Sequence, residues 1–269
     1  MNRKRYIRHL LSIAGLTTVL SSCAPGITQY RLEPVSGDVA RIDGRSTTKA
    51  EQNGIGVVAS FEHEDMEFVV FDIEVKNKTD HAIMVNPSDF QYTLLNVAQD
   101  TLRMQQQNEF LAVQHAVDPD YAASQVAFRQ KKEEKRLKTA KVINTVLFAA
   151  ILISDASSSG KSRNYGEWRQ KRINHDLAWQ ALNVKRAVDY GTHANRMQKY
   201  DQESYRWQAM ALKSTQVAAG ESVRGFIYVR KNPEARYLNL VYTLPEEAAV
   251  PITFQQELVT TRGNKARHR

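Results

Sequence analysis

Alternation of hydrophobic and polar residues dominates the first part of the chain. In residues 67–77 (EFVVFDIEVKN), hydrophobic side chains alternate with acidic and basic ones. A period of two predicts a β-strand with one face in the core and one in water. The β-branched run 54–61 predicts another strand, which we expect to end at a polar turn, 62–65 (EHED). Turn residues bound two further expected strands, at 81–85 and 90–95.

The same pattern returns near the end of the chain. Residues 222–230 (SVRGFIYVR) read as a strand, and alternating hydrophobic residues predict two more strands at 236–244 and 250–258. Gly220 and the sequence 231–234 (KNPE) supply turns between them. Several short alternating strands separated by turn residues predict an all-β sandwich.

Residues 104–211 differ in composition and read as helical. Asp118-Pro119 is typical of an N-cap followed by proline at the first helical position. A Gly/Ser break at 157–160 separates two stretches of good helix formers. In the second stretch one helix face carries Ile173, Leu177, Ala181, Val184 and Val188. This predicts an αα-hairpin inserted into the sandwich, and a helical subdomain packed flat on the sheet is the alternative.

Two stretches resemble the immunoglobulin-like, telokin-like domains of bacterial lipoproteins. They are residues 71–92 (FDIEVKNKTDHAIMVNPSDFQY) and residues 214–229 (STQVAAGESVRGFIYV). The first resembles a strand–turn–strand unit that ends in an Asn/Pro corner, and the second a polar edge, a Gly turn and a long core strand. The resemblance implies a binding or structural module and brings no catalytic residues with it.

We therefore expect an α+β fold, an immunoglobulin-like antiparallel β-sandwich interrupted by a long inserted α-helical hairpin. The expected divisions are a signal peptide (1–22), a tether with the first strands (23–50), the sandwich (51–103 and 212–260), the helical insertion (104–211) and a basic tail (261–269).

The amino terminus resembles a bacterial lipoprotein signal. Four basic residues precede an apolar stretch, 10–20, which is too short to span a bilayer and fits a secretory signal. It ends at Leu20, Ser21, Ser22 and Cys23, which resemble a lipobox whose cysteine is acylated. The alternatives are an ordinary cleaved signal with a chance cysteine, or a short buried helix.

Acylation of Cys23 predicts the location of the protein. Several acyl chains give stable anchoring, at about 0.8 kcal/mol per buried methylene. The next residue is Ala24 rather than Asp. In such lipoproteins that choice favours the outer membrane, so we expect a bacterial cell-envelope protein that faces the periplasm.

Charge and cysteine content narrow the classes of function. The chain has 269 residues, 37 Lys+Arg against 29 Asp+Glu, and one cysteine. A single cysteine excludes an intramolecular disulfide and any cluster held by several cysteines. Residues 118–206 and the tail are basic, whereas the rest is acidic. For an exported protein this favours anionic lipid or an acidic protein as partner over nucleic acid.

Three candidate catalytic or metal motifs are weak. Gly160-Lys161-Ser162 lacks the earlier glycine of a P-loop, because Asp155 stands there. The stretch 220–225 (GESVRG) has one residue too many for a hydrolase nucleophile elbow. The acidic and histidine residues of 62–65 are expected to diverge on a strand end. We therefore expect no enzyme activity, no cofactor and no metal.

One long apolar segment is expected to be covered by another part of the chain, by another protein or by lipid. Residues 142–153 (VINTVLFAAILI) carry no charge, follow the basic stretch 131–141 (KKEEKRLKTAK), and are apolar on all sides. They could lie in the core, associate with a protein or a second copy, or dip into the bilayer. We favour core burial or self-association, because Asn144 and Thr145 interrupt the run. Candidate contact residues are Val142, Leu147, Phe148, Ile151 and Leu152.

These observations predict a lipid-anchored envelope protein of non-enzymatic type that works by interaction or assembly. The alternative is a lipoprotein that binds a small molecule or glycan, for example on the aromatic residues of the second helix, which are Trp168, Trp179, Tyr190, Tyr200, Tyr205 and Trp207. A scaffold should show a projecting hairpin with an apolar outer part, whereas a ligand-binding protein should show an enclosed pocket. A periplasmic adaptor of an efflux pump is a third option, for which the chain is short.

Overall fold

A computed structural model describes residues 27–106, 109–158 and 162–261. The signal peptide 1–22, the lipobox with Cys23 and the tail 262–269 lie outside the described residues. Those three expectations therefore remain predictions.

The first sheet of the sandwich is antiparallel throughout. Its path runs, in order, through β1 (Ile27–Pro34), β15 (Ala248–Thr261), β14 (Tyr237–Leu244), β7 (Phe90–Leu95) and β11 (Val113–His115), with β8 (Thr101–Leu102) also paired to β7.

The second sheet is also antiparallel. Its order is β13 (Ser222–Arg230), β5 (Phe68–Asn77), β4 (Ile55–Asp65), β3 (Arg45–Gln52) and β2 (Asp38–Ile42). Two small pairs flank the sheets, β9 (Met104–Gln106) with β10 (Glu109–Leu111), and β6 (Ile83–Val85) with β12 (Thr215–Val217). A short turn of helix, Pro87–Asp89, precedes β7.

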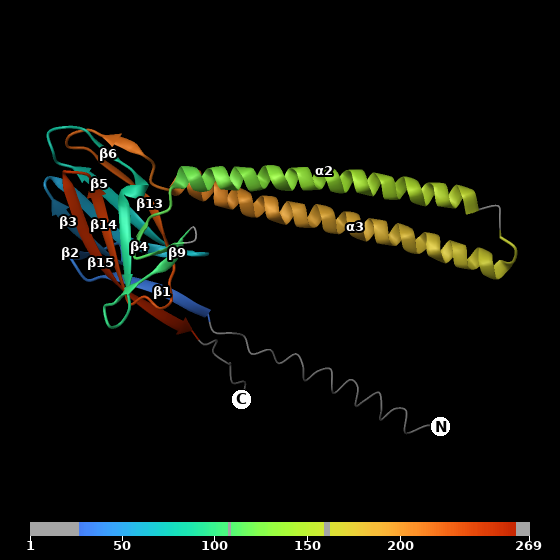
Figure 1. The fold of residues 1–269 in the computed structure, drawn as a ribbon, viewed down its shortest axis with the longest axis horizontal. Helices are drawn as coiled ribbons and strands as arrows, with labels where there is room; N and C mark the ends of the chain where they lie inside the picture. Colours follow the sequence, from blue (N-terminus) through green and yellow to red (C-terminus); the bar gives the residue numbers. More distant parts are fainter. Residues whose placement is uncertain (1–26, 107–108, 159–161, 262–269) are drawn as a thin grey trace, which may run out of the picture.

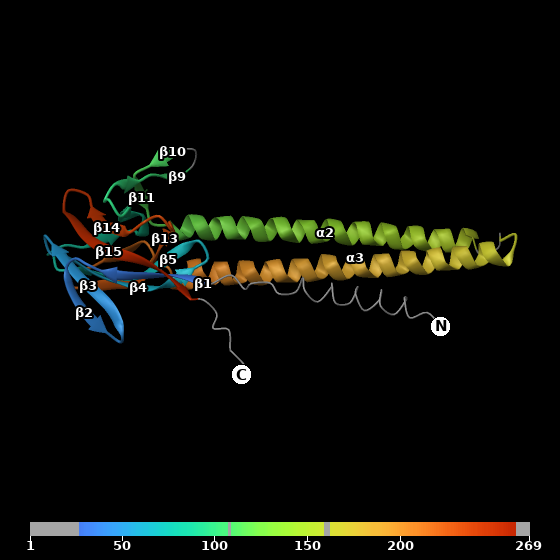
Figure 2. The same ribbon diagram turned by 90° about the horizontal axis from the view of Figure 1, so that it is seen from below.

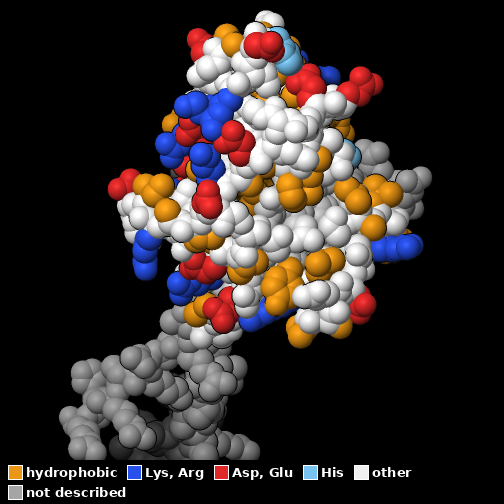
Figure 3. All heavy atoms as spheres, turned by 90° about the vertical axis from the view of Figure 1, so that its left-hand side faces the viewer, with side chains coloured by type: hydrophobic (Ala, Val, Ile, Leu, Met, Phe, Trp, Pro, Cys, Tyr) orange, Lys and Arg blue, Asp and Glu red, His pale blue; other side chains and the backbone are white. Residues whose placement is uncertain are grey.

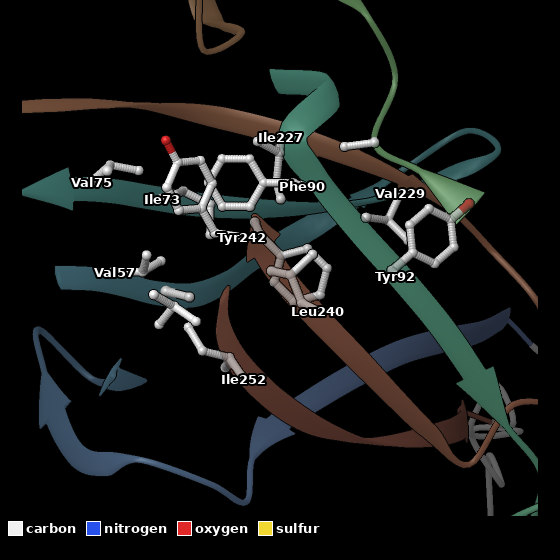
Figure 4. Close-up of a cluster of buried hydrophobic side chains, with 14 of the residues drawn as sticks. Val57, Ile73, Val75, Phe90, Tyr92, Ile227, Val229, Leu240, Tyr242 and Ile252 are labelled. Carbon is white, nitrogen blue, oxygen red and sulfur yellow. The ribbon is translucent and has the colours of Figure 1, made fainter. Parts of the chain in front are cut away.

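The two sheets enclose one hydrophobic core (Figure 4). Alternate residues of β7 and β14 enter it from the first sheet, as their period of two predicts. From the second sheet it receives Val57, Phe71, Ile73, Val75, Ile227 and Val229. The predicted α+β fold, an immunoglobulin-like antiparallel sandwich interrupted by a helical hairpin, is confirmed.

The hairpin consists of α2 (Pro119–Ser158) and α3 (Tyr165–Tyr205). The Asp118 carboxylate caps α2, since its Oδ1 accepts hydrogen bonds from the backbone nitrogens of Asp120 (2.9 Å) and Tyr121 (3.3 Å). The Asn164 side chain caps α3 in the same way. At 1.5 Å per residue each helix is about 60 Å long. Figures 1 and 2 show both helices side by side, projecting away from the sandwich.

A second hydrophobic cluster joins the hairpin to the sandwich, and we call it the root cluster. It contains Phe68, Val70, Val126, Trp207, Ala211 and Tyr228. The ring centroid of Trp207 lies 4.7 Å from that of Tyr228 and 5.7 Å from that of Phe68. A π-helical turn, η3 (Arg206–Met210), continues α3 and carries this tryptophan into the cluster.

Three boundaries differ from the sequence prediction. The expected turn 62–65 continues β4, with a β-bulge between Phe61 and His63, and the chain turns at Met66 instead. Strands β9 to β11 occupy residues expected in the helical insertion, because runs of three residues carry too little periodicity to be read. Strands β1 and β3, expected in the tether region 23–50, belong to the sandwich.

Removing the outer hairpin should leave the sandwich folded. We expect a chain in which Gln130 is joined to Asp201 through a short Gly/Ser linker to unfold cooperatively. The two residues already meet, because Gln130 Nε2 donates a hydrogen bond to Asp201 Oδ1 at 3.1 Å. The free energy of unfolding, measured by urea denaturation, should change by less than about 1 kcal/mol, because the root cluster is kept.

The contrasting variant joins Asp118 to Leu212 and so removes Val126 and Trp207. It should lose several kcal/mol, because Phe68 and Val70 would be left in water. Equal stability of the two shortened chains would contradict the division at the root cluster.

Candidate interaction surface

The contact between α2 and α3 is unusually polar. Between residues 127 and 157, the residues of α2 that are buried or half-buried follow spacings of three and four, and we call them the seam: Gln130, Glu133, Leu137, Ala140, Asn144, Phe148 and Ile151. Three of these seven carry polar side chains. A hydrophobic seam is the usual arrangement for two packed helices.

Hydrogen bonds and ion pairs hold this seam together. Arg196 of α3 lies 2.9 Å from the Glu133 carboxylate, which is 8% exposed. Asn144 Nδ2 donates to Asp189 Oδ2 at 3.0 Å, and Lys185 lies 2.6 Å from the same oxygen. The hydrogen bonds from Lys185 and Asn144 both lower the pKa of the Asp189 carboxyl, and the bond from Lys185 has the larger effect. The seam is therefore closed by charge as much as by hydrophobic contact.

Aromatic contacts complete the seam near the outer end. Phe148 meets Trp179 edge to face, with ring centroids 5.3 Å apart. The Arg186 guanidinium lies over the Phe148 ring, 5.5 Å from its centroid. Leu182 is the most buried residue of α3 here, at 3% exposure.

Hydrophobic side chains instead lie on the outside of the hairpin. On α2, Val142, Val146 and Ile153 are 64%, 62% and 69% exposed. On α3 the stripe recognised in the sequence is exposed too, including Leu177 and Val184 at 56% and 63%. In the outer part of the hairpin, apolar residues therefore lie on the exposed faces as well as in the seam.

Core burial of residues 142–153, one of the readings favoured from the sequence, is wrong. Of the candidate contact residues, Val142, Leu147 and Leu152 are exposed, and Phe148 and Ile151 are half-buried against α3. The hairpin projects beyond the sandwich, so the sheets cannot cover this segment (Figure 1). Leaving it in water is unfavourable, at about 25 cal/mol per Å² of apolar surface.

Asn144 and Thr145 do not interrupt the outer surface as the sequence suggested. Asn144 is 5% exposed and faces α3, with its Oδ1 buried and without a hydrogen-bond partner in the described chain. The Thr145 hydroxyl donates to the Lys141 carbonyl at 2.9 Å. The spacing of Leu137, Ala140 and Asn144 is the signal that would have placed Asn144 in the seam.

Length and composition make α2 a candidate membrane helix, the one such helix in the described part of the chain. An 18-residue window within it has a mean hydropathy of 1.6, and 6% of that window is buried.

The aromatic residues of α3 do not form one binding surface. Trp207 lies in the root cluster and Trp179 in the seam, while Trp168, Tyr190 and Tyr205 are exposed. Because Trp168 and Trp207 are 39 positions apart, nearly the whole helix, about 58 Å, separates them. Trp207 and Trp179 therefore serve local packing rather than a shared surface.

A cavity of about 510 Å³ lies beside the root cluster. Its lining includes Tyr92, His115, Arg129, Glu203, Arg206 and Trp207. The arginines are partly committed to carboxylates, because Arg206 pairs with Asp65 and Arg129 lies 3.5 Å from Glu203. Burial raises the pKa of the neighbouring Tyr228 to about 12. A small-molecule site, the alternative considered from the sequence, would have this lining.

The described structure gives no support to the candidate catalytic and metal motifs. The charged residues of 62–65 diverge: Glu62 pairs with Arg45, Glu64 with Lys231 and Asp65 with Arg206. Gly225 serves packing, because a Cβ there would lie 2.6 Å from Leu212 Cα. Gly160 and Lys161 lie outside the described residues. Among the described residues, no group of three or more His, Cys, Asp or Glu could hold a metal.

The surface of the sandwich differs from that of the hairpin. At the end remote from the helices, hydrophobic side chains form small patches among charged and polar ones (Figure 3). Such scattered apolar surface is ordinary for a folded protein. The outer hairpin is therefore the candidate interaction surface.

Comparison with known proteins adds no assignment, because no family model, curated protein or solved structure matches the chain.

Proposed function

We propose that this is a lipid-anchored protein of the bacterial cell envelope that has no enzymatic role and acts by interaction or assembly. Acylated Cys23 holds it in the membrane, with the outer membrane facing the periplasm as the expected site. The sandwich is a rigid base, and the hairpin is the arm that reaches the partner.

The single observation that supports this function is the exposed aliphatic surface of the projecting hairpin (Figure 1). The seam between the two helices is partly polar, and many of their aliphatic residues are exposed. No packing within the hairpin accounts for these exposed aliphatic residues. A contiguous exposed apolar surface on a folded protein marks an interaction site. The anchoring step rests on the lipobox residues Leu20, Ser21, Ser22 and Cys23.

Site-specific photocrosslinking in intact cells tests the proposal. We expect a photoreactive amino acid at Val146 or Val184 to form adducts with an envelope component, because both side chains are more than 60% exposed on the arm. The matched control is Val97, which is 80% exposed on the sandwich and should give none. Adducts only at Val97, or at none of the three positions, would contradict an interaction arm.

The second candidate is a ligand-binding lipoprotein that uses the cavity beside the root cluster. The volume of about 510 Å³ and the aromatic and arginine lining favour it. Native mass spectrometry of the protein purified from the envelope should then show a bound molecule that Arg230→Ala, in the cavity lining, reduces.

A further inference from the structure

One broad side of the hairpin combines apolar and basic residues. Successive residues of an α-helix are rotated by about 100° around its axis, so each position can be located relative to the buried seam. On α2, Leu147 and Ile143 lie about 60° and 100° from the seam residue Asn144. On α3, Ala181 and Val188 lie about 100° and 120° from the buried Leu182, in the same rotational sense. Because α2 and α3 are antiparallel, equal rotations from the seam reach the same side. We call this side the lateral face, and its apolar members are Ile143, Leu147, Ala150, Leu177, Ala181, Val184 and Val188, all exposed.

Basic residues continue the lateral face toward the sandwich. By the same geometry, Lys132 and Arg136 on α2 and Lys199 on α3 lie on this side, and all three are exposed. The carboxylates that border the face are already paired, Glu203 with Arg129 and Glu167 with Lys171. The lateral face therefore has an apolar outer half and a basic inner half.

Polar groups at the level of the apolar half are turned inward. Asn144, Lys185 and Asp189 bond one another in the seam. The hydroxyl of Thr192, on the lateral face, donates to the Val188 carbonyl one turn back, at 2.7 Å. Desolvating this half would therefore leave few polar groups without partners.

From this arrangement we propose that the lateral face binds an anionic lipid bilayer, which names the partner of the arm and rests on the proposed function. The hairpin lies along the membrane surface, with the aliphatic side chains at the acyl boundary and the lysines and arginine at the headgroups. An apolar face bordered by Lys and Arg is typical of helices that lie in the interface.

Charge favours lipid over a second copy of the chain. Two copies tethered in one membrane would align in the same direction and bring Lys132, Arg136 and Lys199 of each against those of the other. Among the residues that the structure describes, the face has no unpaired carboxylate to offset that repulsion, whereas anionic headgroups attract the basic residues.

Full insertion across the bilayer is disfavoured by α3. A spanning hairpin would carry Arg172 and Asp176, both exposed, into the hydrocarbon beside the apolar part of α2. A hairpin that lies on the surface keeps these charges in water.

Vesicle binding tests the proposal with a matched pair on α2. The mature chain, residues 23–269 with Cys23→Ser, should cosediment with vesicles of phosphatidylglycerol and phosphatidylethanolamine and bind phosphatidylcholine vesicles far less. Leu147→Asp should weaken binding about tenfold, as expected for one large aliphatic side chain. Leu152→Asp, of similar exposure but on the opposite side of α2, should leave binding within about twofold.

The basic half has its own pair. The double variant Arg136→Glu, Lys199→Glu should bind anionic vesicles more weakly and with a smaller dependence on salt. Lys138→Glu, on the opposite side of α2, should have a smaller effect on both the affinity and its salt dependence. Thermal melting of each variant checks that the fold is intact.

Failure of the parent chain to bind anionic vesicles would overturn the lipid proposal. So would an oligomer that Leu147→Asp, and not Leu152→Asp, converts to monomer. In either case, protein adducts at Val146 or Val184 in cells would leave the interaction arm standing, with a protein as its partner.

Discussion

Trp207→Ala should destabilise the protein by about 3–5 kcal/mol, the range for deleting a large buried aromatic side chain. Trp207 is 4% exposed and fills the root cluster between Phe68 and Tyr228. Its loss leaves a cavity where the arm meets the second sheet. Urea denaturation followed by the circular dichroism of the sheets measures the effect.

Trp168→Ala is the matched control. This side chain is 44% exposed near the far end of the hairpin and stacks on Tyr165. Its removal should change the free energy of unfolding by about 0.5 kcal/mol or less. Similar losses for the two variants would mean that the root cluster does not join the hairpin to the sandwich.

Cys23→Ser should abolish acylation and, once the membranes are washed with salt, release nearly all of the protein from them. The thiol is the sole cysteine of the chain, so the variant has no other site for the lipid. An ordinary cleavable signal must precede the variant, so that an uncleaved apolar stretch does not hold it. Labelling with a radioactive fatty acid and fractionation after a salt wash measure the outcome.

The salt wash separates two modes of attachment. Acyl chains resist salt, whereas contact through the basic half of the lateral face is screened by it. A Cys23→Ser chain that stays in the washed membrane fraction would show that acylation is not what anchors the protein.

Local patterns sufficed for much of the sandwich. The predicted ranges 90–95 and 222–230 coincide with β7 and β13. Burial alternates along β7 and leaves a period of two in the sequence, whereas β13 is bounded by the turns at Gly220 and 231–234. The prediction that one face of β5 is exposed to solvent is wrong at Val70 and Asp72, which are buried. The root cluster covers Val70, and Arg224 pairs with Asp72, so residues far away in sequence decide this face.

The candidate surface was visible in the sequence, but its placement was not. Residues 142–153 stood out because they carry no charge beside a basic stretch. Hydrophobicity alone predicts burial, and it cannot show that the hairpin closes on polar residues instead. Pairing Glu133 with Arg196 and Asn144 with Asp189 requires the register of the two helices, which the hydrophobic pattern of either helix alone does not give.

The hydrogen bonds of β13 bear on how the chain folds. Val117 donates to the Tyr228 carbonyl (3.0 Å) before the hairpin, and Leu212 donates to the Phe226 carbonyl (2.8 Å) after it, so both ends of the insertion meet one strand edge. Closing so long a loop from a random coil carries an entropic penalty that grows with its length. Helices with local contacts form quickly, and antiparallel helices bring residues 117 and 212 together. The arm thus shortens the effective loop and allows the two halves of the sandwich to find each other.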